Sequence, residues 1–157
     1  MKEKTKNRIR VISWILFVIY IGGLIYLLFL SEKYGRVGNQ ERSYRYNLVL
    51  FQEIRRFWRL WRVVGIQAAF LNLAGNVLGF VPFGFFVPIL NKRLRKSIVI
   101  TVLGFLMSLT VELIQLVTKV GCFDVDDLLL NTLGAFFGYL FFWICNEIRK
   151  LIYEKKV

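Results

Sequence analysis

The sequence predicts an all-α integral membrane protein, a single bundle of four transmembrane helices with one amphipathic helix at the membrane surface. Two observations carry this prediction. Hydrophobic residues make up 57% of the 157 residues and the mean hydropathy is +0.55, which is more apolar surface than a water-soluble fold can cover. This apolar content is also concentrated in four stretches, each long enough to cross a bilayer core of about 30 Å.

The four predicted spans are separated by polar or charged segments. They are residues 11–30, 66–90, 98–117 and 128–145. The longest connection, residues 31–65, leaves no room for a separate soluble domain, so residues 1–157 are expected to form one domain. Residues 31–40 lack the small-residue cleavage pattern of a secretory signal, so we expect the first span to stay as an anchor.

Small residues and prolines predict how the spans pack. Each of the last three spans carries two small residues one turn apart, a spacing that lets neighbouring helices approach closely. The pairs are Gly75 and Gly79, Gly104 and Ser108, and Gly134 and Gly138. We expect these three spans to form the core and the first to face lipid. Pro82 removes a backbone donor from the second span, so a kink or break is expected there.

The positions of the basic residues predict the orientation. Thirteen of the 22 lysines and arginines lie at the N-terminus, between the second and third spans, or at the C-terminus. By the positive-inside rule these segments are cytoplasmic, so we expect a multi-pass protein of the cytoplasmic membrane with both termini inside. The net charge of +12 is spread over loop ends, which favours anionic lipid headgroups over nucleic acid as partners.

Residues 51–62 show an amphipathic pattern between the first two spans. Apolar residues recur there at helical spacing, as in helices that lie in the membrane interface. The basic residues of the other face are Arg55, Arg56, Arg59 and Arg62. In the predicted orientation they face outward, where guanidinium groups can bind a lipid phosphate in a bidentate manner. Simple anchoring to headgroups is the alternative.

Polar residues form one stripe on each of the last three spans, in the predicted outer half of the membrane. Their spacings of three and four residues place each set on one helix face. The sets are Asn72 and Asn76; Ser108, Glu112 and Gln115; and Asp124, Asp127 and Asn131. We expect them to converge on one site that binds a lipid or substrate. Of the acidic residues that begin the last span, we expect only Asp127 to face inward.

Glu112 is the strongest candidate for a functional residue, because an acidic side chain within an apolar span costs about 2.5–3.5 kcal/mol. The chain has no histidine, so its chemistry rests on carboxylates. Glu112 and Asp127 are candidates for acid–base catalysis, and Glu112, Asp124 and Asp127 for binding a divalent cation. Interhelical hydrogen bonding by the amides is a structural alternative. No other cofactor is indicated.

Four segments of the chain resemble the VanZ-like family. They are Asn47-Leu-Val-Leu-Phe51, Asn72-xxx-Asn76-xxx-Phe80-Val-Pro82-Phe-Gly84, Ser108-xxx-Glu112-xx-Gln115 and Gly121-Cys-Phe-Asp124-Val-Asp-Asp127-xxx-Asn131-Thr-xx-Gly134. The last segment is the most specific. The resemblance implies a small bacterial membrane protein whose name-giving member is associated with teicoplanin resistance. Relatives often carry a basic residue at the position of Cys122, and Lys119 is a candidate to replace it here.

Three functions remain open from the sequence. The first, which we favour, is an envelope protein that binds an anionic outer-leaflet lipid or a polyprenyl-linked wall precursor. The second is an intramembrane enzyme that uses Glu112 and Asp127 on a lipid-linked substrate. The third is a small transporter, which is least favoured because the spans show no internal repeat.

Overall fold

The structure is a computed structural model that describes residues 3–30, 44–64 and 66–154. The elements follow one another in this order: α1 (Glu3–Ile25), the π-helical turn η1 (Tyr26–Leu30), β1 (Tyr46–Asn47), α2 (Gln52–Val64), α3 (Ile66–Leu90), the 3₁₀ turn η3 (Lys92–Leu94), α4 (Ser97–Thr118), β2 (Phe123–Asp124) and α5 (Val125–Glu154).

Four of the described helical segments are long and apolar enough to cross a membrane. They are Asn7–Leu30, Leu73–Leu90, Ser97–Thr118 and Val125–Tyr153. This confirms the predicted all-α bundle of four spans, and the fourth helix extends beyond the predicted residues 128–145 at both ends.

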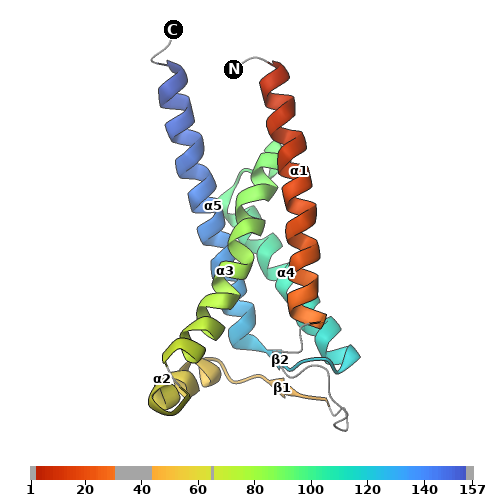
Figure 1. Cartoon of the computed structure of the whole chain (residues 1–157), viewed down its shortest axis with the longest axis vertical. Coiled ribbons are helices and arrows are strands. Elements are labelled where there is room, and N and C mark those ends of the chain that lie inside the picture. Colours follow the sequence, from red (N-terminus) through yellow and green to blue (C-terminus); the bar gives the residue numbers. More distant parts are fainter. Residues whose placement is uncertain (1–2, 31–43, 65, 155–157) are drawn as a thin grey trace.

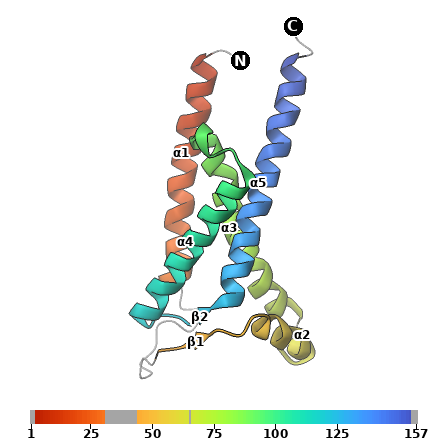
Figure 2. The same ribbon diagram turned by 180° about the vertical axis from the view of Figure 1, so that it is seen from behind.

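The two ends of the bundle are built differently (Figure 1). The first and last helices, α1 and α5, carry the chain termini at one end, which we call the terminal end. The strands β1 and β2 and the helix α2 lie at the opposite end, which we call the α2 end (Figures 1 and 2). Both termini therefore lie on the same side of the bundle, as four spans require. The side of the membrane that they occupy stays a prediction.

The core lies where α3 crosses α5, and glycines make this crossing close. A β-carbon at Gly134 would overlap the carbonyl oxygen of Val77, and one at Gly138 would overlap that of Val81. In return, Gly84 of α3 faces the backbone of Ala135. The predicted small-residue contact is therefore confirmed for α5.

The small residues of the second span do not behave as predicted. A β-carbon at Gly75 would meet nothing within 4 Å, and one at Gly79 would meet only Leu24, at 3.8 Å. The face of α3 that packs on α5 carries Val77, Val81 and Gly84 instead. Spacing alone identified a pair of small residues on α3, but not the face that α5 covers.

The second span continues as a helix through both of its prolines. Of the kink or break expected at Pro82, the break is therefore wrong and the kink stays a prediction. Proline removes one backbone donor and weakens the turn before it. The hydroxyl of Tyr20, on α1, donates to the carbonyl oxygen of Gly79 at 2.8 Å, three residues before Pro82. This hydrogen bond joins α1 to α3 in the turn that precedes the proline.

The helix α1 is exposed over most of its circumference, as predicted for a lipid-facing span. Ser13 and Leu24 are its buried residues among those whose side chains are described. Its main aromatic contact is made by Phe17, whose ring centroid lies 6.4 Å from that of Phe83 and 6.3 Å from that of Phe86, both on α3.

Candidate functional site

A short pair of parallel strands brings two of the motif segments together at the α2 end (Figure 1). Tyr46 pairs with Phe123, and Asn47 pairs with Asp124. The backbone N–H of Phe123 also donates to the carbonyl oxygen of Arg45 at 3.0 Å. The segment that leads into α2 is thereby held beside the segment that leads into α5. Two-residue strands carry no alternating pattern, and the sequence did not predict them.

The C-terminus of α4 turns sharply into β2. Lys119 adopts the left-handed conformation with φ 56°, and Val120 donates its N–H to the carbonyl oxygen of Gln115 at 3.1 Å, a common way to end a helix. Gln115 itself is buried and donates its side-chain amide to the carbonyl oxygen of Leu28 at 3.1 Å. It therefore ties α4 to the end of the first span.

Glu112 and Asp124 form the first part of an acidic cluster. Glu112 is 2% exposed, and its Oε2 accepts the backbone N–H of Asp124 at 3.0 Å. The carboxylate of Asp124 caps α5 by accepting the N–H of Asp126 at 2.8 Å. It also accepts the side-chain amide of Asn47 at 3.3 and 3.2 Å. Burial raises the pKa of the Asp124 carboxyl, against the opposing effect of these two hydrogen bonds.

Asp126 is the centre of the cluster. Its side chain is 0% exposed and accepts the backbone N–H groups of Phe51, of Glu53 at 2.9 Å and of Ile54 at 3.3 Å. Phe51 adopts φ 64°, a conformation that costs a residue with a side chain about 1–2 kcal/mol. This conformation aims its N–H at the same carboxylate as the N–H groups of the first turn of α2. A residue of α5 thus caps the N-terminus of α2.

Two further hydrogen bonds lie within the spans and join α5 to its neighbours. Asn76 of α3 donates its side-chain amide to Oδ1 of Asp127. Asn131 donates its amide to Oγ of Ser108, on α4, at 2.9 Å. Both Ser108 and Asn131 are buried. These contacts are of the interhelical type that the sequence offered as a structural alternative.

The predicted polar stripes do converge at the α2 end, but in pairs. Glu112 meets Asp124, Asn76 meets Asp127, and Ser108 meets Asn131. The side chain of Asn72 lies outside the described part of the chain, as does that of Arg62.

The expectation that only Asp127 faces inward is wrong. Asp124 and Asp126 are 7% and 0% exposed, whereas Asp127 is only partly buried. The segment that runs from β1 to α2 donates hydrogen bonds to Asp124 and Asp126. Sequence reasoning missed Asp126 because its partners lie up to 75 residues earlier in the chain, and a cap donated by another helix leaves no local pattern.

A divalent cation at Glu112, Asp124 and Asp127 stays a prediction. Among residues 3–30, 44–64 and 66–154, no group of three or more His, Cys, Asp or Glu side chains is placed to hold a metal ion. Glu112, Asp124 and Asp126 each accept a backbone N–H group.

The predicted amphipathic helix is confirmed as α2, and it lies crosswise at the end of the bundle, where Figure 1 views it along its axis. Arg55, Arg56 and Arg59 are all exposed. Arg56 pairs with Glu53 at 3.0 Å, whereas in the described part of the chain no carboxylate pairs with Arg55 or Arg59. The side chain of Trp58 is 81% exposed.

Lys119 lies beside the strand pair, with its ammonium 4.4 Å from the ring centroid of Tyr44. This is a cation–π contact, and it links the turn after α4 to the residue that precedes β1 by two positions. That Lys119 replaces the basic residue which relatives often carry at the position of Cys122 stays a prediction.

The comparisons with known proteins agree with the motifs that this site unites. The VanZ/LLP1 family matches residues 17–146. Protein VanZ of Enterococcus faecium is 31% identical over 80 residues, which are 50% of this chain and 48% of that protein. The chain therefore spans about half the length of this curated relative. No solved structure matches. With four candidate spans and a family match over most of its length, this membrane protein belongs to the VanZ/LLP1 family.

Proposed function

We propose that this protein is a bacterial cell-envelope protein that binds an anionic outer-leaflet lipid, or a wall precursor linked to polyprenyl phosphate, through the arginines of α2. The observation that carries the proposal is the capping of α2 by Asp126. A buried carboxylate is costly to desolvate, and this one has its hydrogen bonds with the backbone that begins the arginine helix.

The capping contact gives α2 a defined position. Its first turn is tied to the first turn of α5 by three backbone N–H groups, and the preceding strand β1 is tied to β2. The arginines are thus presented in one orientation at the end of the bundle.

The charges of α2 suit a phosphate ligand. Arg55 and Arg59 are four residues apart and so lie on one face. Both are exposed, and guanidinium groups bind phosphate oxygens in a bidentate manner that lysine does not reproduce. The exposed Trp58 is of a residue type enriched at the membrane–water interface. Together these residues favour a lipid phosphate over a soluble anion.

The carboxylates support binding more than acid–base chemistry. Glu112, Asp124 and Asp126 each accept a backbone N–H, a role that an ionised carboxylate fills without transferring a proton. The enzyme alternative therefore gains no observation of its own. On this proposal, a link to teicoplanin resistance arises because a bound lipid or precursor changes how the drug or its target is presented at the outer leaflet.

The test compares two charge-neutralising double variants in lipid vesicles. The vesicles contain phosphatidylcholine and a small fraction of phosphatidylglycerol that carries a photoreactive headgroup. We expect the intact protein to be labelled in α2, and R55Q/R59Q to lose that labelling about tenfold or more. R149Q/K150Q removes the same charge at the terminal end and should leave the labelling of α2 unchanged.

Two results would remove the proposal. One is equal labelling of α2 in R55Q/R59Q and the intact protein, and the other is equal labelling by a phosphatidylcholine probe. In cells, R55Q/R59Q should lower teicoplanin resistance to the level of cells without the protein, at unchanged protein abundance.

A further inference from the structure

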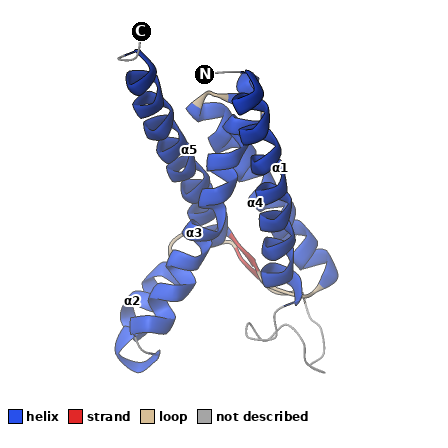
Figure 3. Cartoon of the chain, turned by 45° about the horizontal axis from the view of Figure 1, so that its top comes forward, coloured by secondary structure: helices blue, strands red, loops and turns tan. Residues whose placement is uncertain are grey.

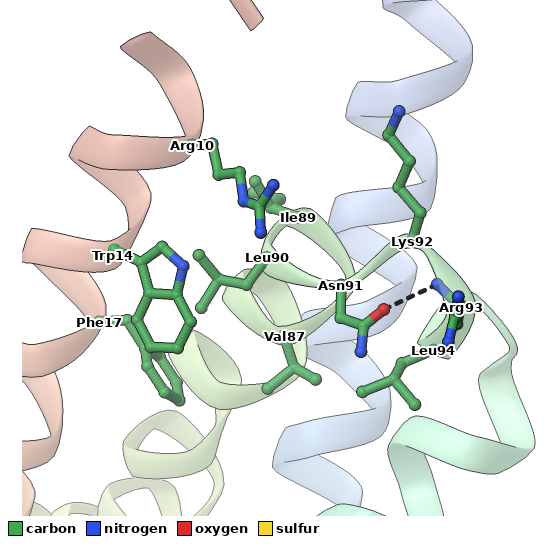
Figure 4. Close-up of a pocket in the computed structure, with 10 residues that line it drawn as sticks. All are labelled: Arg10, Trp14, Phe17, Val87, Ile89, Leu90, Asn91, Lys92, Arg93 and Leu94. Atoms are coloured by element: carbon green, nitrogen blue, oxygen red, sulfur yellow. Dashed lines mark hydrogen bonds between the residues drawn. The ribbon is translucent and has the colours of Figure 1, made fainter. Parts of the chain in front are cut away.

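A second basic feature lies at the terminal end, where the connection between α3 and α4 faces α1. A cleft of about 760 Å³ opens there between α1 and the segment from Val87 to Leu94 (Figure 4). Its volume is within the range of about 300–1,000 Å³ that is typical of ligand sites.

One wall of the cleft is aromatic. Trp14 and Phe17 stand edge to face with ring centroids 6.2 Å apart, and Phe17 packs in turn against Phe83 and Phe86. Figure 4 shows these two rings facing Leu90 across the cleft. These rings and Leu90 therefore form an apolar slot, which suits an acyl chain.

The rim of the cleft is cationic. Arg10, Lys92 and Arg93 are all exposed and line it, and no acidic residue is among the lining residues. Figure 4 shows the guanidinium of Arg10 extending toward Leu90. Three positive charges above an apolar slot complement a ligand with an anionic head and a hydrocarbon tail.

Local hydrogen bonds hold the rim in place. Asn91 caps η3, because its Oδ1 accepts the N–H of Arg93 at 3.0 Å. Arg95 faces inward instead: its Nε donates to the carbonyl oxygen of Pro88 at 2.9 Å, and its guanidinium lies 5.3 Å from the ring centroid of Phe142. Arg95 thus fixes the connection and leaves Lys92 and Arg93 to face outward.

We propose that this cleft binds an anionic phospholipid from the leaflet at the terminal end, with its phosphate at Arg10, Lys92 and Arg93 and an acyl chain against Trp14, Phe17 and Leu90. Basic pockets between transmembrane helices bind anionic headgroups in this manner. The site lies at the opposite end from α2 and does not rest on the function proposed above. By the predicted orientation, its leaflet is the cytoplasmic one.

The experiment uses the full chain in phosphatidylcholine vesicles with a small fraction of phosphatidylglycerol that carries a diazirine in its acyl chain. Peptide mass spectrometry then locates the label. We expect label on the peptides that contain Trp14 and Leu90, and a loss of about tenfold or more in R10Q/R93Q. The control, R149Q/K150Q, lowers the charge of the same end equally, outside the cleft, and should label as the intact protein does.

A second variant tests the apolar slot with all charges intact. L90W should fill the slot and also lower the labelling at Trp14. Equal labelling of R10Q/R93Q and the intact protein, or equal labelling by a diazirine phosphatidylcholine, would overturn the proposal. Labelling of α2 is read in parallel samples with the headgroup probe, so a failure of the α2 site and a failure of this cleft are distinguishable.

Discussion

The helix α5 passes through both ends of the molecule and uses its charged residues in opposite ways. At its start, Asp126 is fully buried and accepts three backbone N–H groups of another segment. At its far end, Glu147 is paired with Lys150 of the same helix at 2.7 Å, where both side chains are well exposed. The same type of carboxylate thus organises tertiary structure at one end and only the helix surface at the other.

The difference follows from what covers each end. The segment from β1 to α2 folds over the start of α5 and supplies N–H donors for its carboxylates, which makes their burial tolerable. The last turns of α5 instead extend away from the other helices (Figure 3), where an ion pair is solvated and contributes little. Whether a carboxylate positions another segment therefore depends on its burial and on the N–H donors around it, and not on its charge alone.

The largest effect is expected where α5 crosses α3. In G138A the new methyl group would overlap the carbonyl oxygen of Val81, and backbone cannot yield as a side chain can. We expect a loss of about 3 kcal/mol in the free energy of unfolding, measured by thermal unfolding in detergent. The control is G75A, whose methyl group meets nothing within 4 Å; an equal loss in G75A would contradict this packing.

The second-largest effect is expected at the α2 end. In D126A three backbone N–H groups lose their common acceptor, and we expect a loss of about 2 kcal/mol. Hydrogen exchange should accelerate at Phe51, Glu53 and Ile54. The matched control at the other end is E147A, which removes an exposed acid of the same helix and should produce no measurable change. Unaltered exchange at Phe51 in D126A would show that α2 is held by other contacts.

A variant of Glu112 tests whether this residue positions the backbone of Asp124 or acts in catalysis. In E112Q the amide oxygen can still accept the N–H of Asp124, so we expect a loss below about 1 kcal/mol and unchanged labelling of α2 by anionic lipid. The profile of envelope lipids and lipid-linked precursors, measured by mass spectrometry, should match that of cells with the intact protein. If the intact protein changes this profile relative to cells without the protein and E112Q does not, the enzyme alternative is favoured instead.

The smallest effect is a pH dependence. Burial raises the pKa of the Asp124 carboxyl in the folded protein above its ordinary value of 3.8, so the folded state holds this proton more tightly than the unfolded chain. The stability that this group contributes is therefore complete below about pH 3.8 and is lost as the pH rises through the raised pKa. D124N should remove this part of the pH dependence. Unfolding midpoints of both proteins from about pH 3 to pH 6 provide the test; a difference of the opposite sign would mean that the hydrogen bonds from Asn47 and Asp126 outweigh burial.

The spans and α2 were predictable because their signals are local. Apolar length predicts a span, and the helical recurrence of Phe51, Ile54 and Trp58 predicts an amphipathic helix. Gly134 and Gly138 were correctly placed in the core because their spacing marks a close approach. In each of these cases the information lies within one helix.

The remaining features depend on partners distant in the sequence. The break expected at Pro82 did not occur, and the nearby Gly79 carbonyl has a donor in Tyr20, which belongs to a different span. The strands β1 and β2 have two residues each, too few for a periodic pattern. Asp126 stood among three acidic residues that all suited a helix N-terminus, and only the folded chain shows which one caps α2.

The most direct test of the central claim is the labelling of α2 by headgroup-photoreactive phosphatidylglycerol in D126A, a variant that leaves Arg55 and Arg59 intact. If Asp126 positions the arginines for lipid, labelling of α2 falls about fivefold or more while that of the terminal-end cleft does not change. If labelling of α2 stays at the level of the intact protein although hydrogen exchange at Phe51, Glu53 and Ile54 has accelerated, the arginines bind lipid without being positioned, and the claim is contradicted.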